Sequence, residues 1–484
     1  MKPQPTLLLV ACKKHVFLFA VLFLQQTAFT QLRLASLFTD NMVLQQQTKA
    51  AIWGWTTPGK NISIKPSWNK KTAAAKADAN GKWKLFVETP TAGGPYEISI
   101  SGDQIVTVKN VMVGEVWLCA GQSNMEMPMK GFKGQPITGS NEAILHSTNK
   151  NIRVYTVPRG AFTTPQENSK PSEWKEAAPE AISNFSATAY YFGKDLQALL
   201  NVPIGLINVS YGGSPVESWM DANTLAAFPD INIPAKTDSI KVPNRTPTAL
   251  YNGMLHPVIG YGIKGMIWYQ GESNYDRPDQ YEKLFPTAVQ QWRREWRLGD
   301  FPFYFAQIAP YNYAQLPPYN AGGKYNSAYL RDAQRKSVNV LPNSAMAVLM
   351  DVGEEGSIHP AHKKEAGQRL ALLALAKTYG GKGFGAESPA YDTLLVANGI
   401  AEVRFTNAPN WLTSYGKELC LFEVAGKDKQ FYPAKAVIYR SSVMVSSPMV
   451  KEPVAVRYAF RDFTTGELFS TEGLPVSSFR TDNW

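Results

Sequence analysis

The chain has 484 residues, of which 44% are hydrophobic, 18% charged and 12% aromatic. This apolar content supports a packed core and, at roughly 100–200 residues per domain, two to four domains; it excludes a disordered, collagen-like or coiled-coil chain. Three cysteines exclude a disulfide scaffold. The net charge of +10 comes from interspersed Lys and Arg residues without a basic run, so no nucleic-acid partner is indicated.

The N-terminal segment has the pattern of a secretory signal. Lys13 and Lys14 precede an apolar run at 15–24, and a short stretch with small residues ends near Thr30. The run is shorter than the ~20 residues that a membrane span needs. We therefore expect residues 1–30 to be a cleaved signal peptide and the protein to be secreted or periplasmic, without stable membrane insertion. An uncleaved anchor is the alternative. The mature chain would keep Cys119 and Cys420, as buried thiols or as one bridge.

Residues 31–110 are predicted to form a small β-sandwich-like domain. Short runs of aromatic and β-branched residues alternate with Gly, Pro and Asn turns, which is typical of antiparallel strands. The predicted strands are 51–55, 61–64, 82–87, 96–100 and 105–108.

Residues 111–384 change to alternating strands and helices, which predicts an α/β domain with a parallel sheet covered on both faces. The predicted strands are 115–120, 204–208, 265–269, 303–307 and 345–350, and the helices are roughly 186–201, 279–298, 327–340 and 362–379. In the last helix Ala366, Leu370 and Leu373 form the apolar face, so we expect Lys363, Lys364 and Glu365 to face solvent. The Pro-rich stretch 232–248 is expected to be an exposed loop. Residues 385–484 alternate again and predict a second β-rich region.

Chemistry-bearing residues follow the predicted parallel strands, where ligands bind in open α/β sheets. These post-strand segments are 121–125 (GQSNM), 210–214 (SYGGS), 270–274 (QGESN) and 351–360 (DVGEEGSIHP). Together they bring a serine, backbone N–H donors, carboxylates and one histidine to one edge of the sheet. That combination is what a serine hydrolase needs.

The histidine is selected by elimination among five. His15 lies in the signal, His146 in a polar stretch, His256 before the third strand, and His362 one helical turn beyond His359. His359 alone is placed to reach Ser123. Simpler alternatives remain: such serines are often helix N-caps, an acid after a strand is often solvated, and His359 itself can cap a helix. His359, His362 and Glu365 have the spacing of metal ligands, but no further Cys or His completes a shell.

Several long segments resemble the sialate O-acetylesterase family of SGNH-type hydrolases. The strongest are GEVWLCAGQSNMEMPM (114–129), GLINVSYGGSPVESW (205–219), LYNGMLHPVIGYGIKGMIWYQGESN (250–274) and DVGEEGSIHPAHKKEAGQRLA (351–371). The likeness continues in SLFTDNMVLQ (36–45), FSATAYYFGKDL (185–196), FPFYFAQIAPY (301–311) and EGLPVSSFRTDNW (472–484), and so covers nearly the whole mature chain. Related enzymes deacetylate xylan and other plant polysaccharides.

The resemblance implies roles for particular residues. Ser123 becomes the nucleophile and His359 the base, with oxyanion donors at the Ser123 and Gly212 N–H groups and in the segment that begins at Gln270. Many relatives carry Asp three residues before the histidine, where this chain has Gly356. The third triad member is therefore open: Glu272 leads, and the alternatives are Asp351, Glu354, Glu355 or a backbone carbonyl.

The expected activity is removal of O-acetyl groups from an acetylated sugar or glycan through an acyl-enzyme, with no metal or organic cofactor. Gln122, Trp219 and Tyr211 are the candidates for substrate binding, along with Trp268 and Tyr269, although Trp219 and Trp268 are equally suited to a core. A secreted carbohydrate-binding protein without catalysis is the rival hypothesis. The sequence does not indicate the acetylated glycan or the oligomeric state.

Overall fold

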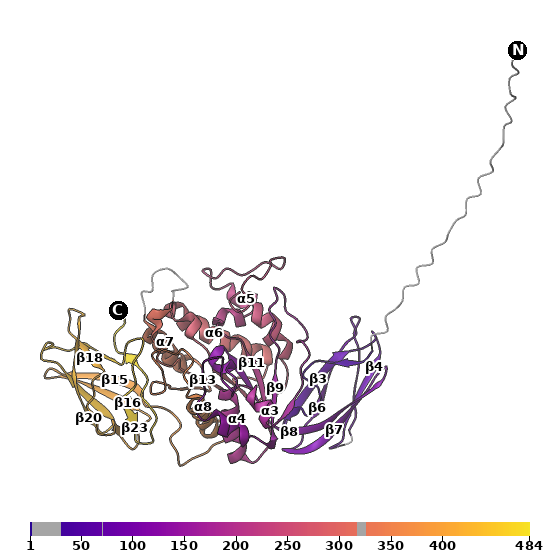
Figure 1. Cartoon of the computed structure of the whole chain (residues 1–484), viewed down its shortest axis with the longest axis horizontal. Helices are drawn as coiled ribbons and strands as arrows, with labels where there is room; N and C mark the ends of the chain where they lie inside the picture. Colours follow the sequence, from indigo (N-terminus) through magenta and orange to yellow (C-terminus); the bar gives the residue numbers. More distant parts are fainter. Residues whose placement is uncertain (2–30, 70, 317–325) are drawn as a thin grey trace.

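The computed structural model describes residues 1, 31–69, 71–316 and 326–484, so the predicted signal peptide lies outside the described residues. Three regions follow one another along the molecule: an N-terminal β region, a central α/β domain and a C-terminal β region (Figure 1). The predicted α/β class with flanking β-rich regions is confirmed.

The N-terminal region forms two sheets around a shared core. Its strands are β1 (Arg33–Leu34), β2 (Val43–Gln45), β3 (Lys49–Trp55), β4 (Asn61–Pro66), β5 (Ala73–Lys76), β6 (Lys82–Glu88) and β7 (Gly93–Ser101). Strands β1, β3 and β6 form one sheet, and β5, β4 and β7 pair in the other. Buried and more exposed residues alternate along β4 and β6, so each sheet turns one apolar face inward.

Strand β8 (Ile105–Gly121) joins the N-terminal region to the central domain. The sequence analysis predicts two strands here, at 105–108 and 115–120, and this division is wrong. The strand stays continuous for 17 residues because its partners change along its length. Its first part pairs with β7 and β2, and its last part pairs with β11 and β12.

The central sheet has the strand order β10-β9-β11-β8-β12-β13-β14, and all neighbours are parallel except the edge strand β10. The remaining bounds are β9 (Asn149–Thr156), β10 (Lys175–Ala177), β11 (Ile204–Ser210), β12 (Gly265–Tyr269), β13 (Phe303–Ala306) and β14 (Ser344–Ala347). The five predicted parallel strands are present. The sequence analysis missed β9, whose first half is the polar stretch Asn149–Asn151.

Helices cover both faces of the sheet, as predicted. Helices α4 and α8 pack together in one apolar cluster, and α6 and α7 pack on the opposite side. The α-helices are α1 (Ser123–Glu126), α2 (Ser140–Leu145), α3 (Pro179–Ser183), α4 (Ala187–Leu200), α5 (Ala222–Leu225), α6 (Pro278–Trp296), α7 (Ser327–Val340) and α8 (Lys363–Lys377). Short 3-10 or π turns are η1 (Val216–Trp219), η2 (Tyr251–Leu255), η3 (His256–Val258), η4 (Glu272–Asn274) and η5 (Tyr313–Gln315).

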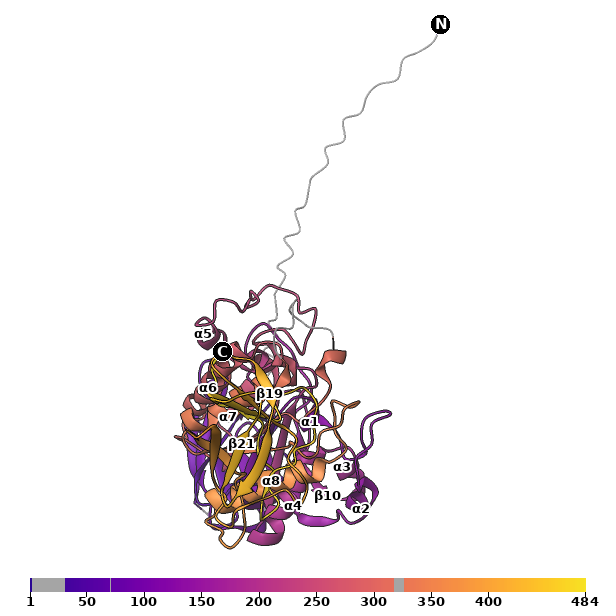
Figure 2. The same ribbon diagram turned by 90° about the vertical axis from the view of Figure 1, so that its left-hand side faces the viewer.

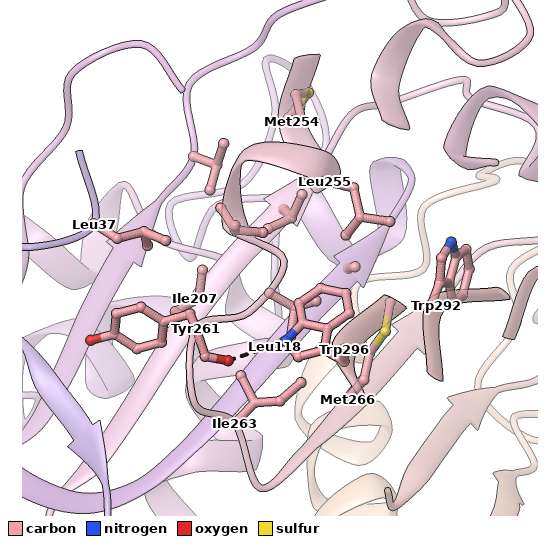
Figure 3. Close-up of a cluster of buried hydrophobic side chains, with 14 of the residues drawn as sticks. Leu37, Leu118, Ile207, Met254, Leu255, Tyr261, Ile263, Met266, Trp292 and Trp296 are labelled. Carbon is pink, nitrogen blue, oxygen red and sulfur yellow. Dashed lines mark hydrogen bonds between the residues drawn. The ribbon is translucent and has the colours of Figure 1, made fainter. Parts of the chain in front are cut away.

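One continuous core connects the N-terminal strands with the α6 side of the central sheet. Figure 3 shows Leu37 and Tyr261 beside Leu118 and Ile207 of the sheet, with Trp296 of α6 donating its indole N–H to the Tyr261 carbonyl at 3.1 Å. The Tyr261 hydroxyl in turn donates to the Val43 carbonyl at 2.7 Å. The N-terminal region is therefore packed onto the central sheet rather than linked to it by a tether.

The C-terminal region has its own apolar cluster, which also includes Val348 and Met350 beyond β14. Its strands are β15 (Ala390–Ala397), β16 (Ile400–Thr406), β17 (Leu412–Thr413), β18 (Phe422–Ala425), β19 (Phe431–Pro433), β20 (Lys435–Tyr439), β21 (Ser442–Ser446), β22 (Ala455–Tyr458), β23 (Phe469–Ser470) and β24 (Phe479–Arg480). Figure 2 looks onto this region, with β19 and β21 in front of the central domain. Cys119 is buried, Cys420 is exposed, and both are free thiols. In the described part of the chain, no helix combines the length and hydropathy of a membrane span.

Candidate active site

The carboxyl ends of three adjacent strands place the predicted site residues side by side. Gly121, the last residue of β8, pairs with Ser210 at the end of β11 and with Tyr269 at the end of β12. The segments that begin with Gln122, Tyr211 and Gln270 therefore leave the sheet at one edge. This confirms the prediction from strand order that these segments meet.

Ser123 is the first residue of the short helix α1, directly after a glycine turn. Gly121 has φ +143°, and a Cβ there would collide with the Tyr269 carbonyl oxygen. Only glycine lets β8 end this close to β12 and turn immediately into α1. Ser123 is buried, and its hydroxyl has no hydrogen-bond partner within the described residues. The hydroxyl is thus not committed to the fold.

Gly212 lies against Ser123, as an oxyanion donor must. A Cβ built at Gly212 would stand 3.3 Å from the Ser123 Cβ and 3.1 Å from Glu126 Oε2. The Gly212 N–H, however, donates to Glu126 Oε2 at 2.8 Å, and Arg159 Nε donates to the other oxygen of this carboxylate at 2.8 Å. An oxyanion role for Gly212 therefore requires the Glu126 carboxylate to yield this N–H, and that role stays a prediction.

His359 precedes α8 and is oriented by an uncharged residue. Its Nδ1 lies 2.7 Å from Oε1 of Gln135, and the Phe132 ring meets the imidazole edge-on at a centroid distance of 5.4 Å. Because an amide oxygen only accepts, Nδ1 carries the proton and Nε2 is left as the basic atom. Burial, together with the nearby Lys363 ammonium, lowers the pKa of His359 to about 4.

The nucleophile and base segments are joined through Asn124 rather than through a Ser123–His359 hydrogen bond. The Asn124 amide nitrogen donates to the Ile358 carbonyl at 3.0 Å and to Glu272 Oε1 at 2.5 Å. Its amide oxygen accepts from Lys363 Nζ at 2.8 Å. The residue after Ser123 therefore touches the residue before His359. Catalytic hydrogen bonds are often long in unliganded enzymes, so the open Ser123–His359 contact is compatible with catalysis.

The leading candidate for the triad acid, Glu272, contacts Asn124 instead of the histidine. It is 3% exposed, its Oε1 accepts from Asn124, and its Oε2 has no partner within the described residues. Burial raises the pKa of Glu272, against a smaller opposing effect of the Asn124 hydrogen bond. The assignment of Glu272 to His359 Nδ1 is therefore corrected: Gln135 holds that position.

The other acidic candidates are also engaged elsewhere. Both oxygens of Asp351 accept from Arg369 of α8, each at 2.6 Å. Glu354 Oε1 accepts from the Ala361 backbone at 2.6 Å, and Glu355 is exposed. Asp351 and Glu354 therefore brace the loop around His359, and neither is hydrogen-bonded to the imidazole.

Two predicted polar site residues serve the turn after β12. Gln270 is fully buried, and its amide nitrogen donates to Asn274 Oδ1 at 2.7 Å and to the Ser214 carbonyl at 3.2 Å. Gln122 Oε1 accepts from the Ser273 N–H at 3.2 Å. These amides connect the strand ends to one another, and the oxyanion role of Gln270 and the substrate role of Gln122 stay predictions.

The aromatic candidates divide between core and site. Trp219 is 0% exposed, donates its indole N–H to Ser214 Oγ at 2.9 Å, and packs edge-on against Trp268. It is a core residue, so its predicted substrate role is wrong. Tyr211, next to Gly212, stays partly exposed beneath the Arg159 guanidinium, 4.3 Å from the ring centroid. Tyr211 remains a candidate for substrate contact.

The alternative metal site is not assembled. His362 is exposed and meets only Glu365, with Nδ1 3.4 Å from Oε1. Across residues 31–69, 71–316 and 326–484 no group of three or more His, Cys, Asp or Glu side chains is arranged to hold a metal ion. His362, the residue before α8, and Glu365 in its first turn are therefore a surface pair.

Sequence reasoning missed three residues of this site. Gln135 lies in an irregular loop, and no periodic pattern marks it. Asn124 lies next to Ser123 in the segment 121–125, but the sequence analysis assigns no role to it. Lys363 was predicted to face solvent, but it is 1% exposed, and burial lowers the pKa of its ammonium to about 7. The error arises because the His359 loop folds over the first turn of α8. The spacing of apolar residues predicts which helix face packs on a neighbouring helix, but not that a loop covers this turn.

The segments that form this site lie within one family match. The family model described as carbohydrate esterase, sialic acid-specific acetylesterase matches residues 113–376. The chain belongs to this family. The match runs from within β8 to the end of α8, and it contains Ser123, Gly212, Gln135 and His359. The chain is thus a serine-type ester hydrolase of the carbohydrate esterases.

Individual relatives extend the match over most of the chain. Sialate O-acetylesterase from Homo sapiens is 30% identical over 405 residues, covering 76% of this chain and 75% of that protein. The Mus musculus enzyme of the same name is 27% identical over 494 residues, covering 88% and 89%. A crystal structure of a carbohydrate acetylesterase from Xanthomonas citri has a TM-score of 0.85 at 35% identity, over 94% of this chain and all of that one. The two flanking β regions are therefore part of the shared architecture.

Proposed function

We propose that the protein is a sialate O-acetylesterase that works through a Ser123–His359 acyl-enzyme mechanism. The observation that carries the proposal is the convergence of the uncommitted Ser123 hydroxyl, the adjacent Gly212 and the Gln135-oriented His359 loop at one sheet edge. Family membership supplies the reaction class, and the relatives named sialate O-acetylesterase supply the substrate class.

In the proposed reaction, His359 Nε2 takes the Ser123 hydroxyl proton as the oxygen attacks the acetyl carbonyl. The new C–O bond gives a tetrahedral intermediate whose oxyanion accepts from backbone N–H groups at Ser123 and Gly212. Collapse breaks the bond to the sugar oxygen, which takes the proton from the His359 imidazolium. Water, deprotonated by His359, then hydrolyses the acetyl-serine and releases acetate.

The corner formed by Arg159 and Tyr211 favours an anionic sugar over a neutral one. Arg159 is 54% exposed, lies over the Tyr211 ring, and binds Glu126, which holds the Gly212 loop. A planar cation beside an aromatic ring suits a sugar that carries a carboxylate. Acetylxylan and other neutral acetylated polysaccharides are the alternative substrates.

The test is acetate release from O-acetylated sialic acid, acetylxylan and p-nitrophenyl acetate by wild type and Arg159→Gln. We expect the highest kcat/KM on O-acetylated sialic acid, with a rise in KM on that substrate alone in the variant. Higher kcat/KM on acetylxylan, unaffected by Arg159→Gln, would transfer the proposal to a polysaccharide acetylesterase. No hydrolysis of any of the three esters would support the non-catalytic carbohydrate-binding alternative.

We also propose that the protein is exported, on the pattern of residues 1–30 alone. Export would give the enzyme access to glycans outside the cytoplasm. N-terminal sequencing of the protein from its native host should begin near Gln31. A mature protein that retains Met1 would contradict the proposal.

A further inference from the structure

We infer that Lys363 is a positioning residue for ester hydrolysis, acting through Asn124 and the His359 loop. The inference rests on the proposed roles of Ser123 and His359. Lys363 Nζ donates to Asn124 Oδ1 at 2.8 Å and to the Pro360 carbonyl at 2.5 Å. One ammonium thus holds the residue after the nucleophile and the residue after the base.

Asn124 lies between two buried charged groups. Its oxygen accepts from Lys363 and its nitrogen donates to Glu272, so the amide bridges an ammonium and a carboxylate that do not touch. Both of those side chains are at least 97% buried, with exposed fractions of 1% for Lys363 and 3% for Glu272. Burying such charges is costly unless they compensate each other, and here the compensation requires Asn124 to keep this orientation. The second donor bond of the Asn124 nitrogen, to Ile358, then sets the distance to the His359 loop.

Lys363 also acts on His359 electrostatically. Its ammonium contributes to the lowered pKa of the imidazole, after burial. The loop facing the ring supplies the uncharged Phe132 and Gln135. Glu272, after β12, and Glu354, in the loop of His359, are the carboxylates whose charges oppose the lowering of the Lys363 pKa by burial. The same ammonium therefore holds the two segments together and adds to the effect of burial in disfavouring the imidazolium.

The packing of α8 does not by itself explain why Lys363 is buried. The helix meets α4 closely at Gly367, one turn further on, and the residue after Lys363, Lys364, is exposed. A lysine at position 363 that served only solubility would face water as Lys364 does. Its burial at the junction of the Ser123 segment, the β12 turn and the His359 loop points to organisation of the site.

The experiment compares Lys363→Met with Lys364→Met as the matched surface control, each by kcat and KM on p-nitrophenyl acetate across pH. We expect Lys363→Met to lower kcat roughly 10- to 100-fold with KM within about threefold, as a displacement near 1 Å does. Loss of the cation should also raise the pKa of His359 and move the acid limb of kcat/KM upward by about one pH unit. Lys363→Arg should retain the low acid limb, and Lys364→Met should match wild type.

Because Lys363→Met leaves Glu272 uncompensated, the double variant Lys363→Met, Glu272→Gln serves as a folding control. It should recover the melting temperature of wild type but keep the raised acid limb. Unchanged kcat and an unchanged acid limb in Lys363→Met would overturn the inference. A serine-directed fluorophosphonate probe distinguishes failure of this inference from failure of the proposed mechanism. Labelling that persists in Ser123→Ala would overturn the nucleophile assignment. Labelling that is lost in Ser123→Ala but proceeds at the wild-type rate in Lys363→Met would overturn the positioning role alone.

Discussion

Nδ1 of His359 lies 2.7 Å from the side-chain oxygen of Gln135, a residue 224 positions earlier in the chain. In serine hydrolases this position usually belongs to a carboxylate that fixes the tautomer and stabilises the imidazolium. An amide oxygen performs the first task fully and the second only through its dipole. The pKa of His359 is low because the ring is buried and lies near the Lys363 ammonium, and no carboxylate partner opposes these two effects.

Replacing Gln135 should therefore test the orienting role directly. Gln135→Leu leaves a buried ring N–H without an acceptor, which costs about 1–3 kcal/mol, and we expect kcat to fall roughly 10- to 100-fold. Gln135→Glu adds a negative charge beside the ring, so the pKa of His359 should rise and the acid limb of kcat/KM should move to higher pH. Steady-state kinetics across pH provide both readouts. A Leu variant with wild-type kcat would remove Gln135 from the mechanism.

Ser123→Ala should lower kcat by roughly 10³-fold or more, because the acyl-enzyme cannot form. The side chain makes no hydrogen bond within the described residues, so the fold should lose little stability. Acetate release and thermal melting measure the two effects. Retention of a tenth of the activity would show that another residue is the nucleophile.

The pH profile of the unmodified enzyme should reflect the depressed pKa of His359. Burial and the Lys363 ammonium disfavour the imidazolium, so the ring stays a neutral base down to a pH of about 4, well below the usual histidine value near 6.5. We expect kcat/KM to be flat between about pH 6, where Lys363 is largely protonated, and pH 5, and to fall below that. An acid limb near pH 6.5 would contradict the geometry of the His359 loop.

Asp351→Asn and Glu272→Gln distinguish structural from catalytic acids. Asp351 is 19% exposed and bound by Arg369, so its replacement should lower the free energy of unfolding by about 2–3 kcal/mol, near the lower end for buried pairs, with kcat within about threefold. Glu272→Gln should depress kcat through Asn124 while leaving KM nearly unchanged. Chemical denaturation and steady-state kinetics supply the comparison. A large loss of kcat in Asp351→Asn with normal stability would return the triad acid to that residue.

The two aromatic candidates should separate by phenotype. Trp219→Phe removes the hydrogen bond to Ser214 and part of a packed indole, so we expect a loss of about 1–3 kcal/mol in stability and an unchanged KM. Tyr211→Ala removes a partly exposed ring under Arg159, so KM on the glycan ester should rise several-fold with the melting temperature preserved. Melting curves and glycan kinetics on both variants decide this. The reverse pattern would place Trp219 at the substrate.

The sequence predicts those parts of the molecule that depend on a regular spacing of apolar residues along the chain. Apolar periodicity places the four long helices within two residues of their observed ends, and the strand-end rule brings the Ser123, Gly212 and Glu272 segments together. Prediction from the sequence fails where two residues far apart in the chain meet and no pattern marks either of them, as for the contact between Gln135 and His359. It also fails at Lys363, because helical periodicity identifies the face toward α4 but not the loop that covers the first turn. The role of Trp219 is ambiguous in the sequence, because an indole shortly after a glycine turn is suited both to a buried core and to stacking on a sugar ring.

Strand β8 runs unbroken from the N-terminal sheets to the glycine that precedes Ser123. A boundary at residue 110 therefore divides a strand. A fragment starting at 111 would lose residues 105–108 of β8, which pair with β7, and would also lose β2 and β7, the partners of residues 111–114. The N-terminal sheets and the Ser123 segment are thus held by the two ends of the same strand. Thermal disturbance of the N-terminal sheets should therefore reach the nucleophile segment directly, along one continuous strand.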